Sequence, residues 1–130
     1  MQFCSFLDIA MDVIKPRISI EYIENATIVT FTDEKILEEM DINALQESIM
    51  SVIEQAHRLN LILDFCKVRF LSSAVLGLLI RISKKVYERN GQLRLCNIDS
   101  RIYEIFKITR LNKIFDIYDD VASAAASLAD

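Results

Sequence analysis

Hydrophobic and polar positions near the start of the chain alternate in a way that predicts two strands. The segments Ile18–Ile23 and Ala26–Phe31 are rich in β-branched and aromatic residues. The pair Glu24-Asn25 between them suits a tight turn, so we expect an antiparallel hairpin. The acidic segment Thr32–Met40 follows, and we expect it to be irregular or to form a short turn.

The next two elements show how helical and strand patterns alternate along the chain. Asp41 is placed to cap a helix that ends near Ala56, and a continuous apolar run from Leu59 to Phe65 is typical of a buried parallel strand. A second helix is expected to start at Ser72 or Ser73 and to reach Glu88. The inward faces of these two helices are predicted to be Ile42, Leu45, Ile49, Val52, Ile53 and Ala56, and Leu76, Leu79, Ile80, Ser83, Val86 and Tyr87.

The same alternation continues to the end of the chain. The remaining elements are expected to be a turn at Asn90-Gly91, a strand at Gln92–Cys96, a helix capped by Asp99 or Ser100, a strand at Ile114–Ile117 and a final helix after Asp119 and Asp120.

This element order predicts an α/β fold. Strands that alternate with helices form parallel sheets, so we expect a small, mostly parallel sheet with an N-terminal antiparallel hairpin strand and about four packed helices. Binding sites in such sheets lie at the carboxyl ends of the strands, where the loop from Cys66 to Ser73 is expected. Cys66 itself is expected to be a small buried residue near its strand end.

The chain is predicted to consist of an amphipathic arm, residues 1–16, and one domain, residues 17–130. We expect the arm to pack on its own domain, and a docking or homodimer contact is the alternative. Its apolar positions fit one face of a helix: Phe3, Phe6, Leu7, Ala10, Met11 and Ile14.

Composition narrows the function. The 130 residues are 52% hydrophobic, which excludes a disordered chain, and the net charge of −4 argues against direct nucleic-acid binding. The longest apolar stretch, Ala74–Ile80, is too short to span a bilayer, and no signal peptide is recognised, so we expect a cytoplasmic protein. Three cysteines without a CxxC pair, a single His57 and no glycine-rich phosphate loop predict no metal site, no cofactor and no enzymatic activity.

One stretch carries a family signature. Leu63-Asp64 is expected to end a buried strand, and Phe70-Leu71-Ser72-Ser73-Ala74-Val75-Leu76-Gly77 follows it. The stretch resembles the pattern F-[ML]-D-S-[ST]-G-[LV]-G of STAS domains, the family of anti-sigma factor antagonists. The segments Ile98–Phe106 and Leu111–Phe115 resemble later parts of that pattern. An acidic residue that the family carries near its site corresponds to Ile36 here.

The resemblance implies a regulatory role without catalysis. The family's phosphorylated serine falls on Ser73, with Ser72 as the alternative, and the partner-binding surface falls on Phe70, Leu71, Ser72, Ser73, Ala74 and Val75. The implied partners are an anti-sigma factor that is also a serine kinase, and a cognate phosphatase. A phosphate at a helix N-terminus adds about −1.5 to −2 charges and is tolerated there by the helix dipole.

Three alternatives stay open at this point. Ser72 and Ser73 can serve only as helix caps, which stabilise a helix by about 1 kcal/mol. The protein can be a cytoplasmic STAS accessory subunit of a membrane transporter for lipids or anions. It can also be a scaffold subunit of a signalling complex that needs no phosphorylation.

Overall fold

The predicted hairpin forms at the predicted residues. In the computed structural model, which describes residues 18–55 and 59–128, β1 (Ile18–Ile23) pairs antiparallel with β2 (Ala26–Phe31). The register joins Ile23 to Ala26 across the turn. The predicted arm of residues 1–16 and His57 lie outside the described residues.

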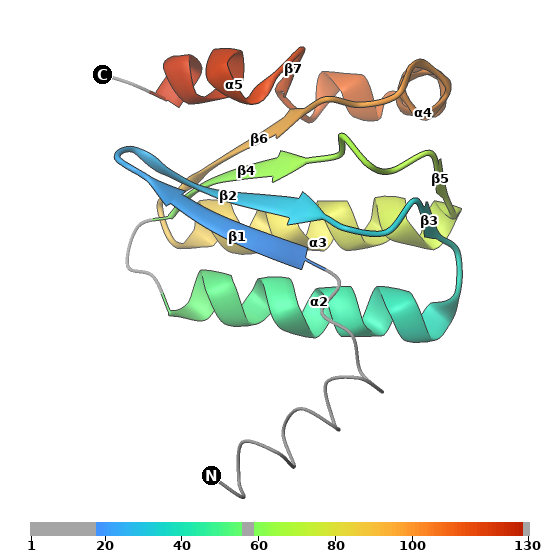
Figure 1. The fold of residues 1–130 in the computed structure, drawn as a ribbon, viewed down its shortest axis with the longest axis horizontal. Helices are drawn as coiled ribbons and strands as arrows, with labels where there is room; N and C mark the ends of the chain where they lie inside the picture. The colour runs from blue at the N-terminus through green and yellow to red at the C-terminus, as the bar shows by residue number, and fades with distance from the viewer. Residues whose placement is uncertain (1–17, 56–58, 129–130) are drawn as a thin grey trace, which may run out of the picture.

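A five-stranded sheet forms the centre of the domain, in the order β1-β2-β4-β6-β7 (Figure 1). Strands β4 (Asn60–Asp64), β6 (Gln92–Cys96) and β7 (Ile117–Tyr118) run parallel to β2, and β1 is the antiparallel edge strand. This confirms the predicted fold class. Leu61 and Leu63 on one face of β4 and Ile62 on the other are fully buried, as expected for a strand that is covered on both faces.

The helices cover both faces of this sheet. Figure 1 shows α2 and α3 below the sheet and α4 and α5 above it. A larger core lies between the sheet and α2, α3 and α4, and a smaller core lies under α5. The bounds of the helices are α2 Glu39–Glu54, α3 Ser73–Glu88, α4 Ser100–Ile108 and α5 Val121–Leu128.

Three sequence predictions about the helices need correction. Helix α2 begins two residues before Asp41, because the backbone N–H of Ile42 already bonds to the carbonyl of Glu38 at 3.1 Å. On α3, Ile80 is only half-buried and Tyr87 is 48% exposed, whereas Val75, Leu78 and Ile82 are buried. The buried side of α3 therefore differs from the predicted one, because α3 packs against α2 as well as against the sheet.

The strand predicted at Ile114–Ile117 is wrong for all but its last residue, since β7 is Ile117–Tyr118. Arg110 has a left-handed φ of 63°, which ends α4, and the chain then forms a 3-10 turn at Leu111–Lys113. The backbone N–H groups of Ile114 and Phe115 bond to the carbonyl of Leu111, so these residues belong to a turn. Only Ile117 and Tyr118 reach β6, opposite Leu95 and Cys96.

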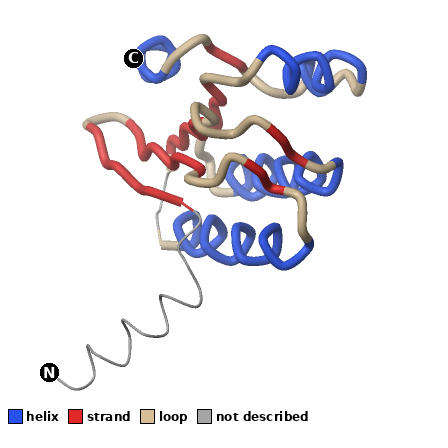
Figure 2. Tube along the Cα trace, turned by 45° about the vertical axis from the view of Figure 1, so that its right-hand side comes forward, coloured by secondary structure: helices blue, strands red, loops and turns tan. Residues whose placement is uncertain are grey.

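Two short strands were not predicted at all. Lys35–Ile36 forms β3 within the expected irregular segment, and Phe70–Leu71 forms β5 within the expected loop. The two pair in parallel and make a separate two-stranded sheet (Figure 2). This small sheet joins the segment before α2 to the segment before α3.

Candidate functional site

The loop between β4 and α3 is held in place by backbone hydrogen bonds to the segment before α2. The N–H groups of Arg69 and Phe70 donate to the carbonyl of Glu34 at 2.8 and 3.1 Å. The N–H of Ser72 donates to the carbonyl of Ile36 at 3.0 Å. Because these partners are far apart in sequence, the first residues of α3 are fixed in space next to the start of α2.

A buried carboxylate anchors the other end of this loop. Asp64, at the end of β4, is 8% exposed, and its Oδ1 accepts hydrogen bonds at 3.0 Å from the Cys66 backbone N–H and from the Asn97 side-chain amide. The aspartate therefore joins the loop after β4 to the loop after β6. These are the carboxyl ends of neighbouring parallel strands, where the sequence predicted a site.

The thiols near Asp64 are not activated nucleophiles. Cys66 is exposed, which corrects the prediction that it is buried, because the chain turns outward immediately after Phe65. Partial desolvation of the sulfur and the nearby Asp64 carboxylate raise the pKa of the Cys66 thiol. Burial also raises the pKa of Cys96 to about 12, so this thiol stays protonated at neutral pH.

The two serines at the start of α3 differ in accessibility. Ser72 occupies the N-cap position, but its side chain makes no capping hydrogen bond. Its Oγ is buried and has no hydrogen-bond partner. Among residues 18–55 and 59–128 it is the only buried side-chain polar atom of this kind. Ser73 is the first residue of α3 and is exposed. An approaching enzyme can therefore reach Ser73 much more easily than the hydroxyl of Ser72.

Ser73 lies at an open cavity of about 550 Å³ between the first turns of α2 and α3, called here the Ser73 cavity. Arg81, two turns along α3, donates to Gln46 Oε1 of α2 at 2.8 and 3.2 Å. The Glu39 carboxylate also lines the cavity, so a new charge on Ser73 would interact with both Glu39 and Arg81. Its lining residues are Leu37, Glu39, Ile42, Asn43, Ser72, Ser73, Ala74, Gly77 and Arg81.

A second hollow, called here the Phe70 groove, lies between β5 and α4 and has a volume of about 230 Å³. Leu37 lines both hollows, so the two adjoin at this residue. Leu37, Phe70 and Ile105 are 49%, 42% and 37% exposed. The lining residues of the Phe70 groove are Leu37, Arg69, Phe70, Leu71, Arg101, Ile102 and Ile105.

The structure places the residues predicted to bind a partner in two adjoining hollows and in the core. Phe70 and Leu71 line the Phe70 groove, while Ser72, Ser73 and Ala74 line the Ser73 cavity. Val75 is only 1% exposed and packs in the core, so it offers a partner no surface. Leu37, Arg101 and Ile105 join this surface, and sequence reasoning missed them because their elements meet only in the folded chain.

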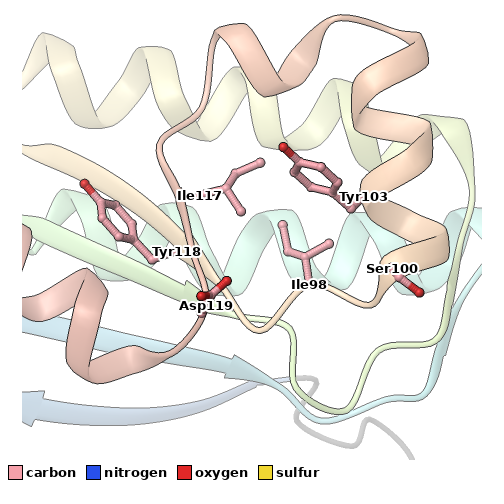
Figure 3. Close-up of a pocket in the computed structure, with 6 residues that line it drawn as sticks. All are labelled: Ile98, Ser100, Tyr103, Ile117, Tyr118 and Asp119. Atoms are coloured by element: carbon pink, nitrogen blue, oxygen red, sulfur yellow. The ribbon is translucent and has the colours of Figure 1, made fainter.

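A third hollow, of about 350 Å³, lies where β6 and β7 end (Figure 3). Ile98, Ile117 and Tyr103 gather on its α4 side, while the Tyr118 ring points away from them. Its polar lining consists of the Asp119 carboxylate and the hydroxyl residues Ser100, Tyr103 and Tyr118.

Two arginines of the α3 segment reach α2. Arg81 donates to Gln46, and Arg89, the C-cap residue of α3, donates to the Glu54 carbonyl at 3.2 Å. Lys84 is exposed and Lys85 half-buried.

Comparison with known proteins identifies the family. The STAS domain model matches residues 17–124, so the chain belongs to the STAS domain family. The anti-sigma-B factor antagonist of Bacillus subtilis is 33% identical over 73 residues, which are 56% of this chain and 65% of that protein. The anti-sigma F factor antagonist of Paenibacillus polymyxa is 23% identical over 53% of this chain and 59% of that protein. Both alignments thus span less than two thirds of the relative.

Solved structures share the fold across most of the chain. A STAS domain protein from Planctomyces limnophilus superposes with a TM-score of 0.80, at 19% identity, over 87% of this chain and 98% of that one. The phosphorylated form of Bacillus SpoIIAA gives a TM-score of 0.65 at 15% identity, over 85% and 96% of the two chains. The murine anion transporter Slc26a9 gives 0.71 at 16% identity, over 83% of this chain but 18% of that one.

Relatives named as anti-sigma factor antagonists and structures of STAS domains together place this chain among the antagonist-like STAS domains. Within residues 18–55 and 59–128, the structure contains no helix with the length and apolar character needed to cross a membrane.

Proposed function

We propose that this protein is a non-enzymatic anti-sigma factor antagonist that binds an anti-sigma factor with serine kinase activity. Phosphorylation of Ser73 by that kinase would end the binding, and a phosphatase would restore it. The observation that carries the proposal is the position of Ser73, which is exposed at the first residue of α3, beside the Ser73 cavity.

The geometry favours Ser73 over Ser72 as the modified residue. The Ser72 Oγ is buried, so a phosphate there would have to displace the surrounding chain. A phosphate on Ser73 instead adds about −1.5 to −2 charges to an open surface. Glu39 and Arg81 line the same cavity, so the added charge would be repelled by one and attracted by the other, and the surface that a partner fits would change.

The helix itself would tolerate the modification. Negative charge at a helix N-terminus is stabilised by the helix dipole, by roughly 0.3–1 kcal/mol at an exposed site. The first turn of α3 contains no acidic residue that would oppose it. The modification would therefore change the interface and leave the domain folded.

A paired pull-down from the source organism tests this proposal. The baits are the wild-type chain, Ser73→Glu and Ser73→Ala, and the captured proteins are identified by mass spectrometry. We expect an ATP-binding anti-sigma kinase on the wild-type and alanine baits and at least a tenfold loss on the glutamate bait. Incubation of the captured kinase with ATP should phosphorylate the wild-type chain and not Ser73→Ala. Transporter subunits recovered equally on all three baits would overturn the proposal and favour the accessory-subunit alternative.

A further inference from the structure

The Phe70 groove is an apolar surface with positive charges at its edge. Arg101 of α4 and Lys35 of β3 lie 5.4 and 5.6 Å from the Phe70 ring centre, within cation–π distance. The ring nevertheless stays 42% exposed, so part of its surface is open to a partner. Large apolar side chains gathered in this way on an exposed surface mark interaction sites.

Helix α4 extends the apolar surface beyond the groove. Arg101, Ile105 and Ile108 follow one another at spacings of four and three residues, which places them on one side of the helix. Ile108 is 79% exposed and Ile105 37%. The adjacent side of α4 is anchored in the core by the buried residues Ile102 and Phe106, so the exposed stripe is presented on a fixed helix.

Charge at the groove is opposite to that of the whole molecule. The chain carries a net charge of −4, yet Lys35, Arg69 and Arg101 surround the Phe70 ring. Asp99 lies between the two arginines, at 3.9 Å from Arg69 and 3.4 Å from Arg101. The side chains of Arg69 and Arg101 are still 46% and 68% exposed. Arg69 Nη1 already donates to the Cys66 and Val68 carbonyls at 3.0 and 3.4 Å, so the donors available to a further carboxylate lie mainly on Arg101.

We infer that the Phe70 groove binds a short acidic amphipathic segment of a partner protein. Apolar side chains of that segment would cover Phe70, Leu37 and Ile105, and its carboxylates would bond to Arg69 and Arg101. Arginine is suited to this task, because its planar guanidinium can hold a carboxylate with two parallel hydrogen bonds. The inference rests on the proposed function, since Phe70 and Leu71 belong to the proposed partner surface, and it specifies the chemistry of the partner.

The segment around Ile36 contributes a lysine and an apolar side chain to the groove. Ile36 is 1% exposed and pairs with Leu71. On either side of it, Lys35 lies over the Phe70 ring and Leu37 lines the groove, while Glu34 and Glu38 follow further out along the chain.

Selection from a random 12-residue peptide display library on the immobilised full chain tests the inference. We expect the selected peptides to be enriched in Asp and Glu together with Leu, Ile, Phe or Met. Fluorescence anisotropy of a labelled selected peptide should show at least tenfold weaker binding to Arg101→Glu and to Ile105→Asp. Added NaCl should weaken binding to the wild-type chain, since exposed charges are screened by salt.

Matched controls separate the groove from general charge and fold effects. Lys84→Glu makes the same charge change on exposed α3, and Ile114→Asp makes the same apolar-to-acid change outside the groove. Both controls should bind the peptide as the wild type does, and circular dichroism should show that all four variants are folded. Selected peptides without acidic residues, or equal binding to Arg101→Glu and Lys84→Glu, would overturn the inference.

The peptide experiment requires neither a kinase nor a phosphate. If the groove binds no acidic peptide, the Ser73 pull-down can still succeed. If the phosphorylation proposal is wrong, the chain can still bind the peptide. The two results are therefore distinguishable. Ser73→Glu can be used in both experiments. It changes the Ser73 cavity and not the Phe70 groove, so it should bind the peptide within about threefold of the wild-type affinity.

Discussion

Neighbouring residues of the same type have different roles at the start of α3. Ser72 stands at the N-cap with an unbonded, buried hydroxyl, and Ser73 stands exposed one residue later. The sequence suggested that either could cap the helix. By contrast, Asp99 caps α4 with a real bond, because its Oδ1 accepts from the Arg101 backbone N–H at 2.9 Å.

Removal of the Ser72 hydroxyl should therefore cost little stability. For Ser72→Ala we expect a change in the free energy of unfolding below about 0.5 kcal/mol, against about 1 kcal/mol for a serine that does cap. The reason is that no cap bond is lost and an unsatisfied buried hydroxyl is removed. Urea denaturation measures the change. A loss of 1 kcal/mol or more would show that the hydroxyl is satisfied in solution.

The Asp99 cap gives a stability difference that depends on pH. The hydrogen bond from the Arg101 backbone N–H, followed by the Arg101 and Arg69 side chains, lowers the pKa of the Asp99 carboxyl. A carboxyl with a lower pKa in the folded state stabilises the fold above its unfolded pKa of about 3.9, and this contribution disappears as the pH falls through the folded value. Asp99→Ala should therefore melt at a lower temperature near neutral pH, and the deficit should shrink in strong acid. Thermal melts across this range provide the measurement, and a deficit that does not depend on pH would contradict it.

Cys96 should resist alkylation in the folded protein. Burial raises its pKa to about 12, so both its thiolate population and its access to reagents are small at mildly alkaline pH. Peptide mapping after iodoacetamide treatment should find Cys96 unmodified in the native chain and modified in urea. Since a raised pKa means that the unfolded chain loses its proton first, Cys96 also lowers stability as the pH rises from about 9 toward 12.

The turn between α3 and β6 passes very close to the backbone of the residue before β4. At the turn between α3 and β6, Asn90 takes a left-handed φ of 61°, and the Gly91 N–H bonds to the Val86 carbonyl at 2.9 Å. A Cβ on Gly91 would lie 1.9 Å from the Leu59 carbonyl oxygen. The sequence predicted a turn here, but the reason for glycine is contact with a distant residue.

The two glycines of the chain should respond oppositely to alanine. Gly91→Ala should destabilise the protein by about 2 kcal/mol or more, since backbone at β4 must move to admit the methyl group. Gly77→Ala should stabilise it by roughly 0.5–1 kcal/mol, because Gly77 lies within α3 and its added Cβ would come no closer than 3.6 Å to Arg81 Nη1. Urea titrations of both variants compare them directly. Equal effects of the two changes would contradict the packing described for Gly91.

On the scale of the whole molecule, the fold brings the starts of α2 and α3 to one end of the sheet. Residues 34–37 and 69–74 lie there together, joined by β3 and β5 (Figure 2). A change on Ser73 should therefore act on α2 as well as α3.

A phosphomimetic variant tests this coupling without any partner. In Ser73→Glu, amide chemical shifts in two-dimensional NMR spectra should change around the Ser73 cavity, including residues of α2 such as Asn43, and should stay unchanged under α5. The melting temperature should change by less than about 2 °C, since the added charge lies at an exposed helix N-terminus. Shift changes throughout the core would mean that the residue is structural and would count against a surface switch.

The sequence by itself determined the elements whose patterns are local. The hairpin strands, the α/β order, a cap at Asp99 or Ser100 and the position of the loop before α3 could all be predicted, because alternation, helical spacing and capping act over a few neighbouring residues. The family pattern on Phe70–Gly77 pointed to Ser73, with Ser72 as the alternative.

Only the tertiary structure decided which of those residues can be reached. Ser72 and Ser73 look equivalent in sequence, and Val75 looks as available as Phe70, until β3 and α2 pack beside them. Strands of two residues carry no periodic signal, so β3 and β5 could not be predicted. The Phe70 groove depends on residues from three separate segments, around 37, 70 and 105. Burial and surface charge at such a place are sums over distant contacts, and they exist only once the chain has folded.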